Sequence, residues 1–329
     1  MEQLRLVTGG RETTRLGYGC SSLMAGIGRR QSLRLLDTAY DAGVRHFDVA
    51  PLYGYGEAER CLGDLLARHG DITVATKFGL ASPERSGMLR AARRLAEPLL
   101  QRIPALKRAA RSASAAAAAP PRSDFSVQEA RTSLENSLRL LRTDHIDIFL
   151  LHEVESADLT GNTLLRFLEH STTNGTVGIF GVASDTAKIA SLQRERPGYC
   201  RVLQHGWSVF DPLEPQQTVL HIHYSAVAAA FQTLRHSLIA DKARCRRWSE
   251  ITGRDLERRE QLAALILKAA LVLHPNTILL VSSKNHAHIK ENVRVAEDVS
   301  LEAPARRLYD LVQREGLASA ANQPPEGRR

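Results

Sequence analysis

The sequence predicts an α/β protein, a (β/α)8 TIM barrel with an N-terminal β-hairpin and a long insert after the third strand. Its 329 residues are 43% hydrophobic, enough for the core of one large barrel or of two ordinary domains. Short runs rich in Val, Ile and Leu alternate with longer stretches of helical period, as in parallel strands joined by helices. Eight such units can be counted, and no G-x-G-x-x-G motif follows the first strand. These observations favour a closed barrel over an open, doubly wound sheet.

The predicted strands are short and dense in apolar residues, as strands buried on both faces should be. They are 16–22, 44–49, 72–76, 146–151, 176–182, 201–205, 218–224 and 277–282. Ahead of the first strand, residues 4–16 form two alternating arms around Gly9 and Gly10. This pattern predicts a β-hairpin that closes one end of the barrel.

Start and stop signals predict the helices between these strands. Ser126 and Glu129 have the spacing of a capping box in front of an amphipathic helix. Two other amphipathic segments end on Gly43 and Gly70, where a left-handed C-terminal residue is expected. The connection after the sixth strand, 211–217, is short and proline-rich, so we expect its helix to be vestigial.

The net charge of +8 is concentrated in one segment. Residues 81–125 hold nine bases against three acids, a local balance of +6, and include an Ala-rich run. No aromatic ladder accompanies these bases, so a solvated insert is favoured over a nucleic-acid binder. We therefore expect one barrel domain over 1–315 that contains this insert, followed by a disordered tail over 316–329.

Cysteine usage and hydropathy indicate the compartment. The four cysteines lie far apart without a C-x-x-C pair, so neither a disulfide framework nor a zinc cluster of cysteines is predicted. The sequence shows neither an apolar leader nor a run of the roughly 18 apolar residues that a membrane span requires. We expect a soluble, unprocessed, cytoplasmic protein; its oligomeric state cannot be read from the sequence.

Polar residues follow three consecutive predicted strands at the point where each strand ends. They are Asp48, Lys77 and His152, and Tyr53 follows Asp48 in the same loop. Functional residues of such barrels lie at the C-terminal ends of the strands, so we expect all four at one mouth. Delivering a proton to a carbonyl oxygen while a hydride reaches its carbon requires residues of these kinds.

Each of these residues has an expected role. A tyrosine is a poor acid at its ordinary pKa of about 10, and the ammonium of Lys77 is expected to bring the pKa of Tyr53 towards neutrality. Asp48 is expected to keep the buried Lys77 charged, and His152 to bind the carbonyl oxygen or to shuttle the proton. Any one of them alone has an ordinary structural explanation. Together they favour a reductase-type site.

The same segments resemble the aldo-keto reductase family. Residues 39–66 are similar to the family signature around its catalytic Asp and Tyr, and 74–79 to the segment with its catalytic Lys. Residues 137–153 resemble the stretch that ends in its catalytic His. The resemblance implies a (β/α)8 barrel that binds a nicotinamide cofactor, usually NADPH, and reduces aldehydes or ketones. It also implies that the catalytic tetrad is Asp48, Tyr53, Lys77 and His152.

The resemblance covers 14–80 and 126–300 and implies a set of cofactor contacts. These are Gly19, Asp48, Ser184, Gln204, Tyr224, Ser282, Ser283, His288, Glu291 and Asn292. Ala183 and Ser184 stand where the family has a Ser and an Asn for the carboxamide. His288 stands where the family often has an arginine for the 2′-phosphate, and Ser282 replaces a frequent lysine. The expected cofactor is NADP(H), with NAD(H) as the alternative.

A second hypothesis for the function comes from another class of protein. The chain could be a non-catalytic nicotinamide-binding regulatory or scaffold subunit, since parts of the cofactor pattern depart from the family. The expected partner is a small carbonyl or alcohol whose identity depends on loops, above all 81–125 and 226–256. No metal site is predicted, because we expect His221 and His223 on the seventh strand to face opposite sides of the barrel wall.

Overall fold

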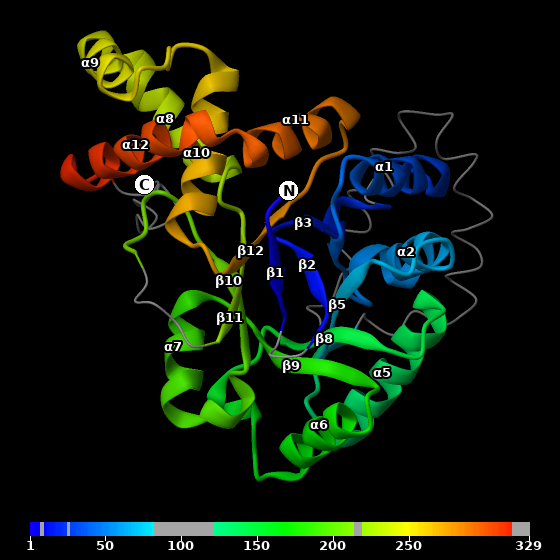
Figure 1. The fold of residues 1–329 in the computed structure, drawn as a ribbon. Helices are drawn as coiled ribbons and strands as arrows, with labels where there is room; N and C mark the ends of the chain where they lie inside the picture. Colours follow the sequence, from blue (N-terminus) through cyan, green and yellow to red (C-terminus); the bar gives the residue numbers. More distant parts are fainter. Residues whose placement is uncertain (7–9, 25–26, 82–121, 214–218, 318–329) are drawn as a thin grey trace, which may run out of the picture.

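Eight parallel strands close into a barrel in the computed structural model, which describes residues 1–6, 10–24, 27–81, 122–213 and 219–317 (Figure 1). Strand β12 pairs with β3 to close the ring, which confirms the predicted (β/α)8 barrel. In barrel order the strands are β3 (Leu16–Gly19), β4 (His46–Asp48), β5 (Thr73–Phe78), β8 (Ile146–His152), β9 (Val177–Ala183), β10 (Val202–Gly206), β11 (Leu220–Tyr224) and β12 (Thr277–Val281).

The predicted N-terminal hairpin is present. Strands β1 (Gln3–Arg5) and β2 (Glu12–Thr14) pair in antiparallel fashion. Leu4 and Leu6 pack against the apolar cluster inside the barrel, which includes Ile148 and Ile222. Because the hairpin precedes the start of β3, it closes the end of the barrel opposite the strand C-termini.

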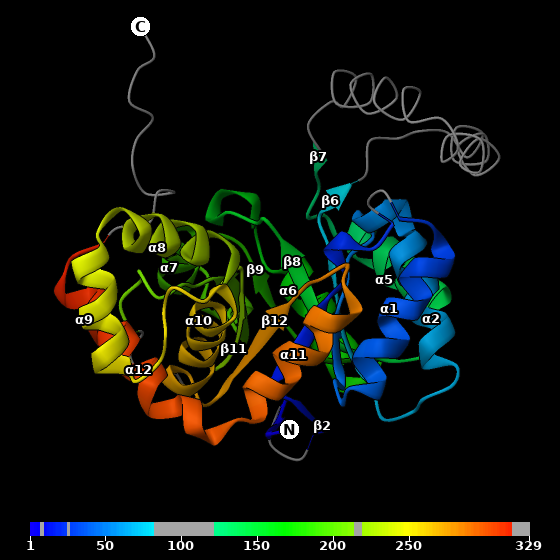
Figure 2. The same ribbon diagram turned by 90° about the horizontal axis from the view of Figure 1, so that it is seen from above.

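Helices cover the outside of the barrel, as Figures 1 and 2 show. One side carries α1 (Arg29–Asp41), α2 (Glu57–Leu66), α5 (Val127–Leu141) and α11 (His286–Glu297). The other α-helices of the described residues are α6 (Thr163–Thr173), α7 (Thr186–Glu195), α8 (Ala228–Ala240), α9 (Lys242–Thr252), α10 (Arg259–Leu273) and α12 (Glu302–Arg314). Between β11 and β12 three helices stand where a simple barrel has one, so this connection is the elaborated part of the fold.

Two of the predicted helix signals need correction. The Ser126 hydroxyl accepts from the Glu129 amide at 3.2 Å, but the Ser126 amide donates to Asp124 at 2.8 Å. Only half of the predicted capping box therefore forms, because the Ser126 amide binds the Asp124 carboxylate and not the Glu129 carboxylate. Gly43 has the expected positive φ, whereas Gly70 does not. Helix α2 ends at Leu66, which leaves Gly70 beyond the helix terminus.

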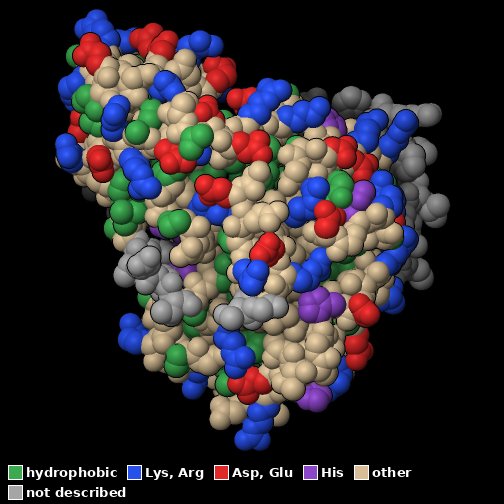
Figure 3. Space-filling view, viewed as in Figure 1, with side chains coloured by type: hydrophobic (Ala, Val, Ile, Leu, Met, Phe, Trp, Pro, Cys, Tyr) green, Lys and Arg blue, Asp and Glu red, His purple; other side chains and the backbone are tan. Residues whose placement is uncertain are grey.

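Some of the predicted segments are only partly described. Strands β6 (Leu80–Ala81) and β7 (Arg122–Ser123) pair with each other at the base of the predicted insert. Residues 82–121, which carry most of the predicted basic insert, and residues 318–329 of the predicted tail lie outside the described residues. On the face shown in Figure 3, basic and acidic side chains are interspersed. Within the described part of the chain, none of the helices combines the length and apolar character needed to cross a membrane.

The described residues of the connection after β10, 207–213 and 219, contain no helix, and residues 214–217 of the predicted vestigial helix lie outside the described residues. The orientation predicted for His221 and His223 is wrong. Both point outward from β11, whereas Ile222 between them packs inside the barrel. Side chains alternate along a strand with a period of two, so residues two apart share a face.

Candidate active site

A cavity of about 890 Å³ opens at the C-terminal ends of the barrel strands. All of the predicted catalytic and cofactor residues line this cavity except Ser184. Strand ends from around the barrel contribute to it, together with the start of α11 and parts of α8 and α10. The structure thus brings residues distant in sequence to the mouth at which barrel enzymes place their active sites.

A buried ion pair lies at the base of the cavity. The Lys77 Nζ of β5 donates to the Asp48 Oδ1 of β4 at 2.5 Å and to the Val49 carbonyl at 3.3 Å. The other Asp48 oxygen accepts from the Gln204 Nε2 of β10 at 2.7 Å. Burial is the largest single effect on the pKa of Lys77 and lowers it, but the Asp48 carboxylate, Tyr53 and Cys20 together outweigh burial, so the pKa is raised. Lys77 is therefore an ammonium fixed at a defined point.

Tyr53 stands beside this ion pair. It lies in the turn between β4 and α2, with its ring centroid 5.4 Å from the Lys77 Nζ and 6.3 Å from the His152 ring. Burial raises the pKa of Tyr53, and Lys77 lowers it by less. The prediction that Lys77 brings this pKa towards neutrality is therefore wrong. Asp48 already offsets the charge of Lys77, so the ammonium does not overcome the desolvation of the phenol.

His152 completes the group at the end of β8. Burial, followed by the charge of Lys77, lowers the pKa of His152 to about 4. The imidazole is neutral at pH 7 and presents one N–H donor and one acceptor. This protonation state favours the expected role of orienting a carbonyl oxygen over that of a charged shuttle.

The depressed pKa predicts a pH dependence of stability. An unfolded histidine takes up its proton near pH 6.5, whereas folded His152 does so near pH 4. Between these values the unfolded state binds more protons, so His152 lowers the free energy of unfolding as the pH falls. Urea unfolding at pH 7 and at pH 5 should show that the free energy of unfolding falls more between these pH values in the wild type than in His152→Gln. Equal losses in the two proteins would contradict the assignment.

The predicted adenosine end lies at the start of α11. Asn285 caps this helix by accepting from the Ala287 amide at 2.9 Å, and the Ser282 hydroxyl donates to Ser22 at 2.8 Å. Ser283 and His288 line the same part of the cavity wall. Serine hydroxyls beside unsatisfied amides of a helix start provide a favourable environment for a phosphate.

One predicted contact is not brought to the cavity. Ser184 is fully buried, and its hydroxyl donates to the Val154 carbonyl at 3.2 Å. Its neighbour Ala183 lines the cavity instead. The Ser184 hydroxyl is therefore engaged within the fold and is not presented to a ligand in this arrangement.

The cavity is also lined by residues that the sequence did not predict as site residues. Phe231 of α8 and Arg259 of α10 line it, with the guanidinium carbon 5.5 Å from the ring centroid. Glu153, at a φ of 58°, also lines the cavity just after His152. The helices of the β11–β12 connection return over the mouth of the barrel, and no local sequence pattern predicts that path. The expectation that 226–256 would contribute to specificity includes Phe231 but neither Arg259 nor Glu153.

Comparison with known proteins gives the family. A model of the Aldo/keto reductase family matches residues 15–304. This match covers most of the chain, and the protein therefore belongs to the aldo/keto reductase family, as the resemblance implied.

Individual relatives match parts of the sequence. The chain is 40% identical over 83 residues to pyridoxal 4-dehydrogenase of Microbacterium luteolum, covering 24% of this chain and 24% of that protein. It is 30% identical over 176 residues to D-threo-aldose 1-dehydrogenase of a Pseudomonas species, covering 51% of this chain and 49% of that protein. The matched regions thus span about half or less of each of these relatives.

Solved structures share the whole fold. An aldo-keto reductase from Bacillus halodurans in its holo form superimposes with a TM-score of 0.70 at 20% identity, over 100% of both chains. An aldo-keto reductase from Klebsiella pneumoniae in complex with NADPH superimposes with a TM-score of 0.61 at 19% identity, over 94% of this chain and 96% of that one.

Proposed function

We propose that this protein is an NAD(P)H-dependent oxidoreductase that reduces an aldehyde or ketone to an alcohol, or catalyses the reverse reaction. The observation that carries the proposal is the arrangement at the base of the cavity. A buried ammonium held by Asp48 lies beside the Tyr53 phenol and a neutral His152. Membership of the aldo/keto reductase family supports the same chemistry.

The residues present fit a nicotinamide dinucleotide. The cavity of about 890 Å³ reaches from the Lys77–Asp48 pair to the start of α11. Tyr224 lines it close to the catalytic group, where an aromatic ring would stack on a nicotinamide, and Gly19 leaves one wall without a side chain. Ser282 and Ser283 would hold the phosphates together with the first amides of α11. When bound, the nicotinamide supplies the hydride that the carbonyl carbon accepts.

Tyr53 would act as the general acid. Its raised pKa keeps the hydroxyl protonated at neutral pH, so a proton is available for the carbonyl oxygen during reduction. The Lys77 ammonium stabilises the phenolate left behind, and Asp48 keeps that ammonium charged and in place. His152 would donate an N–H to the same carbonyl oxygen and thereby orient it. In the reverse reaction the Tyr53 phenolate would accept the proton of the alcohol, and the raised pKa of Tyr53 keeps that phenolate scarce at neutral pH.

We propose NADP(H) as the preferred cofactor and NAD(H) as the alternative. The NADPH complex of the Klebsiella relative supports this preference, whereas His288 and Ser282 stand where more basic residues are expected. Among the described residues that line the cavity, Arg259 is the one permanently charged base besides Lys77. We infer that Arg259 supplies part of the charge that a phosphate of the cofactor requires.

Arg259→Ala is expected to raise the KM for NADPH about 2- to 5-fold with little change in kcat, the upper part of the range for an exposed charge pair. Arg258→Ala is the matched control, because Arg258 is the exposed neighbour that does not line the cavity. Steady-state kinetics with varied NADPH measures both variants. Equal KM values for Arg259→Ala and Arg258→Ala would remove Arg259 from the cofactor site.

The proposed function is tested by titrating the protein with NADPH and NADH in parallel and assaying a panel of aldehydes and ketones. Fluorescence of the reduced nicotinamide reports binding, and its loss with a carbonyl reports turnover. Binding with turnover supports the proposal. Tight binding without turnover on any carbonyl would instead favour a nicotinamide-binding regulatory or scaffold subunit.

We also propose a cytoplasmic location, which the four buried, free cysteines support.

A further inference from the structure

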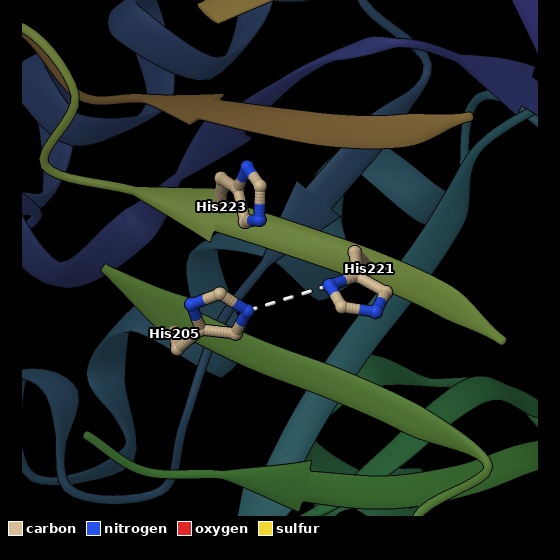
Figure 4. A group of neighbouring side chains, drawn as sticks. All are labelled: His205, His221 and His223. Atoms are coloured by element: carbon tan, nitrogen blue, oxygen red, sulfur yellow. Dashed lines mark hydrogen bonds between the residues drawn. The ribbon is translucent and has the colours of Figure 1, made fainter. Parts of the chain in front are cut away.

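Three histidines gather on the outer face of β10 and β11, away from the cavity (Figure 4). His205 lies directly opposite His223 in the parallel register, and His221 is two residues earlier on β11. All three side chains are buried, with exposed fractions of 2% for His205, 4% for His221 and 1% for His223. The sheet register therefore sets the spacing of the three imidazoles, and no loop has to bring them together.

One nitrogen of each ring lies within 4.8 Å of a nitrogen of the other two. The His205 Nε2 and the His221 Nδ1 are 3.4 Å apart. This is long for a hydrogen bond. Two nitrogens bound at tetrahedral angles to one zinc ion, each about 2.0–2.1 Å from it, are themselves about 3.3–3.4 Å apart. The observed separation already equals that value.

We propose that His205, His221 and His223 form a binding site for a divalent transition-metal ion, with Zn²⁺ as the expected occupant. Imidazole nitrogens are preferred ligands of zinc. The candidate ligand nitrogens are at most 4.8 Å apart, so any pair has to close by about 1.5 Å at most to reach the separation of two zinc ligands. The three imidazoles are neutral ligands, and the fourth tetrahedral position is left for a water or hydroxide.

The surroundings favour a structural ion. The Trp207 ring is stacked on His223 with its plane inclined by 15°, and the His274 ring lies edge-on to His223 at 4.7 Å. These rings separate the site from bulk solvent, so the single water or hydroxide in the fourth position would be enclosed together with the ion. The described part of the β10–β11 connection has no helix to cover the strands, and an ion bound to both strands would fasten them together there. The inference does not depend on the proposed oxidoreductase activity.

The competing interpretation is that the imidazoles only pack as aromatic rings. His223→Phe distinguishes metal binding from aromatic packing, because phenylalanine keeps a ring for packing and removes the nitrogens. His170→Ala is the matched control, since His170 is an exposed histidine on α6.

The test uses the full chain without an affinity tag, treated with EDTA and dialysed, then titrated with ZnSO₄. Isothermal calorimetry should give one Zn²⁺ per chain, and Zn²⁺ should raise the Tm by several degrees. His223→Phe should bind at least ten-fold more weakly, whereas His170→Ala should match the wild type. Co²⁺ should give the intense visible bands of a tetrahedral site in the wild type, a readout that stands even if the variant does not fold.

Three results would overturn the proposal. One is the absence of stoichiometric Zn²⁺ binding by the wild type. Another is equal Zn²⁺ affinity of His223→Phe and His170→Ala. The third is a Co²⁺ spectrum with only the weak bands of a hydrated ion. Any of these would leave the three histidines as an aromatic cluster.

Discussion

Tyr53→Phe is expected to lower turnover by on the order of 100-fold or more while NADPH binding changes by no more than a few fold. The substitution removes a single hydroxyl and keeps the ring that lies 5.4 Å from Lys77. Only the proton donor is lost, so the barrel and the cofactor cleft should be unaffected. The measurements are kcat on a verified carbonyl substrate and the Kd for NADPH from fluorescence.

Tyr40→Phe provides the matched control for this prediction. The Tyr40 hydroxyl donates to Asp71 at 3.1 Å on the outer surface, away from the cavity-lining residues. The Tyr40→Phe variant should therefore retain the turnover of the wild type. A Tyr53→Phe protein that turns over as fast as Tyr40→Phe would show that another group donates the proton.

Lys77→Met is expected to abolish turnover and to destabilise the fold. The Asp48 carboxylate would remain buried with Gln204 as its remaining side-chain partner, and breaking a buried ion pair by removing one partner typically costs about 3–5 kcal/mol. Turnover should fall because nothing would stabilise the Tyr53 phenolate. Urea unfolding gives the stability, and steady-state kinetics gives the activity.

The double variant Lys77→Met with Asp48→Asn separates the two effects. It removes both buried charges and keeps an amide that Gln204 can bind, so stability should recover in part while turnover stays lost. Activity that recovered together with stability would mean that Lys77 acts only through the fold. A double variant as unstable as the sum of the single variants would mean that the two charges do not interact.

The barrel was predictable because its signals are local and repeated. Strands buried on both faces produce short apolar runs, and the order of these runs and helices leaves few alternative topologies. The details that failed depend on competition between neighbours. Asp124 took the amide that the capping box at Ser126 required, and α2 ended before Gly70.

The position of the catalytic group was also predictable, because parallel strands bring their C-terminal ends to one mouth. The sign of the Tyr53 pKa shift was not, since it depends on how much desolvation exceeds a charge already offset by Asp48. Arg259 and Phe231 reach the cavity from helices whose path over the mouth is a tertiary feature. The shared outward face of His221 and His223, in contrast, was readable from the two-residue period of a strand.

We propose above all that a nicotinamide cofactor bound in the cavity gives its hydride to a carbonyl carbon while Tyr53 supplies the proton. A single-turnover reaction with NADPH deuterated at the transferred position of the nicotinamide, followed by mass spectrometry of the alcohol, tests it most directly. We predict one deuterium on the former carbonyl carbon with the wild type and on the order of 100-fold slower labelling with Tyr53→Phe. Bound NADPH that never passes its deuterium to any of the aldehydes or ketones in the panel would contradict the claim.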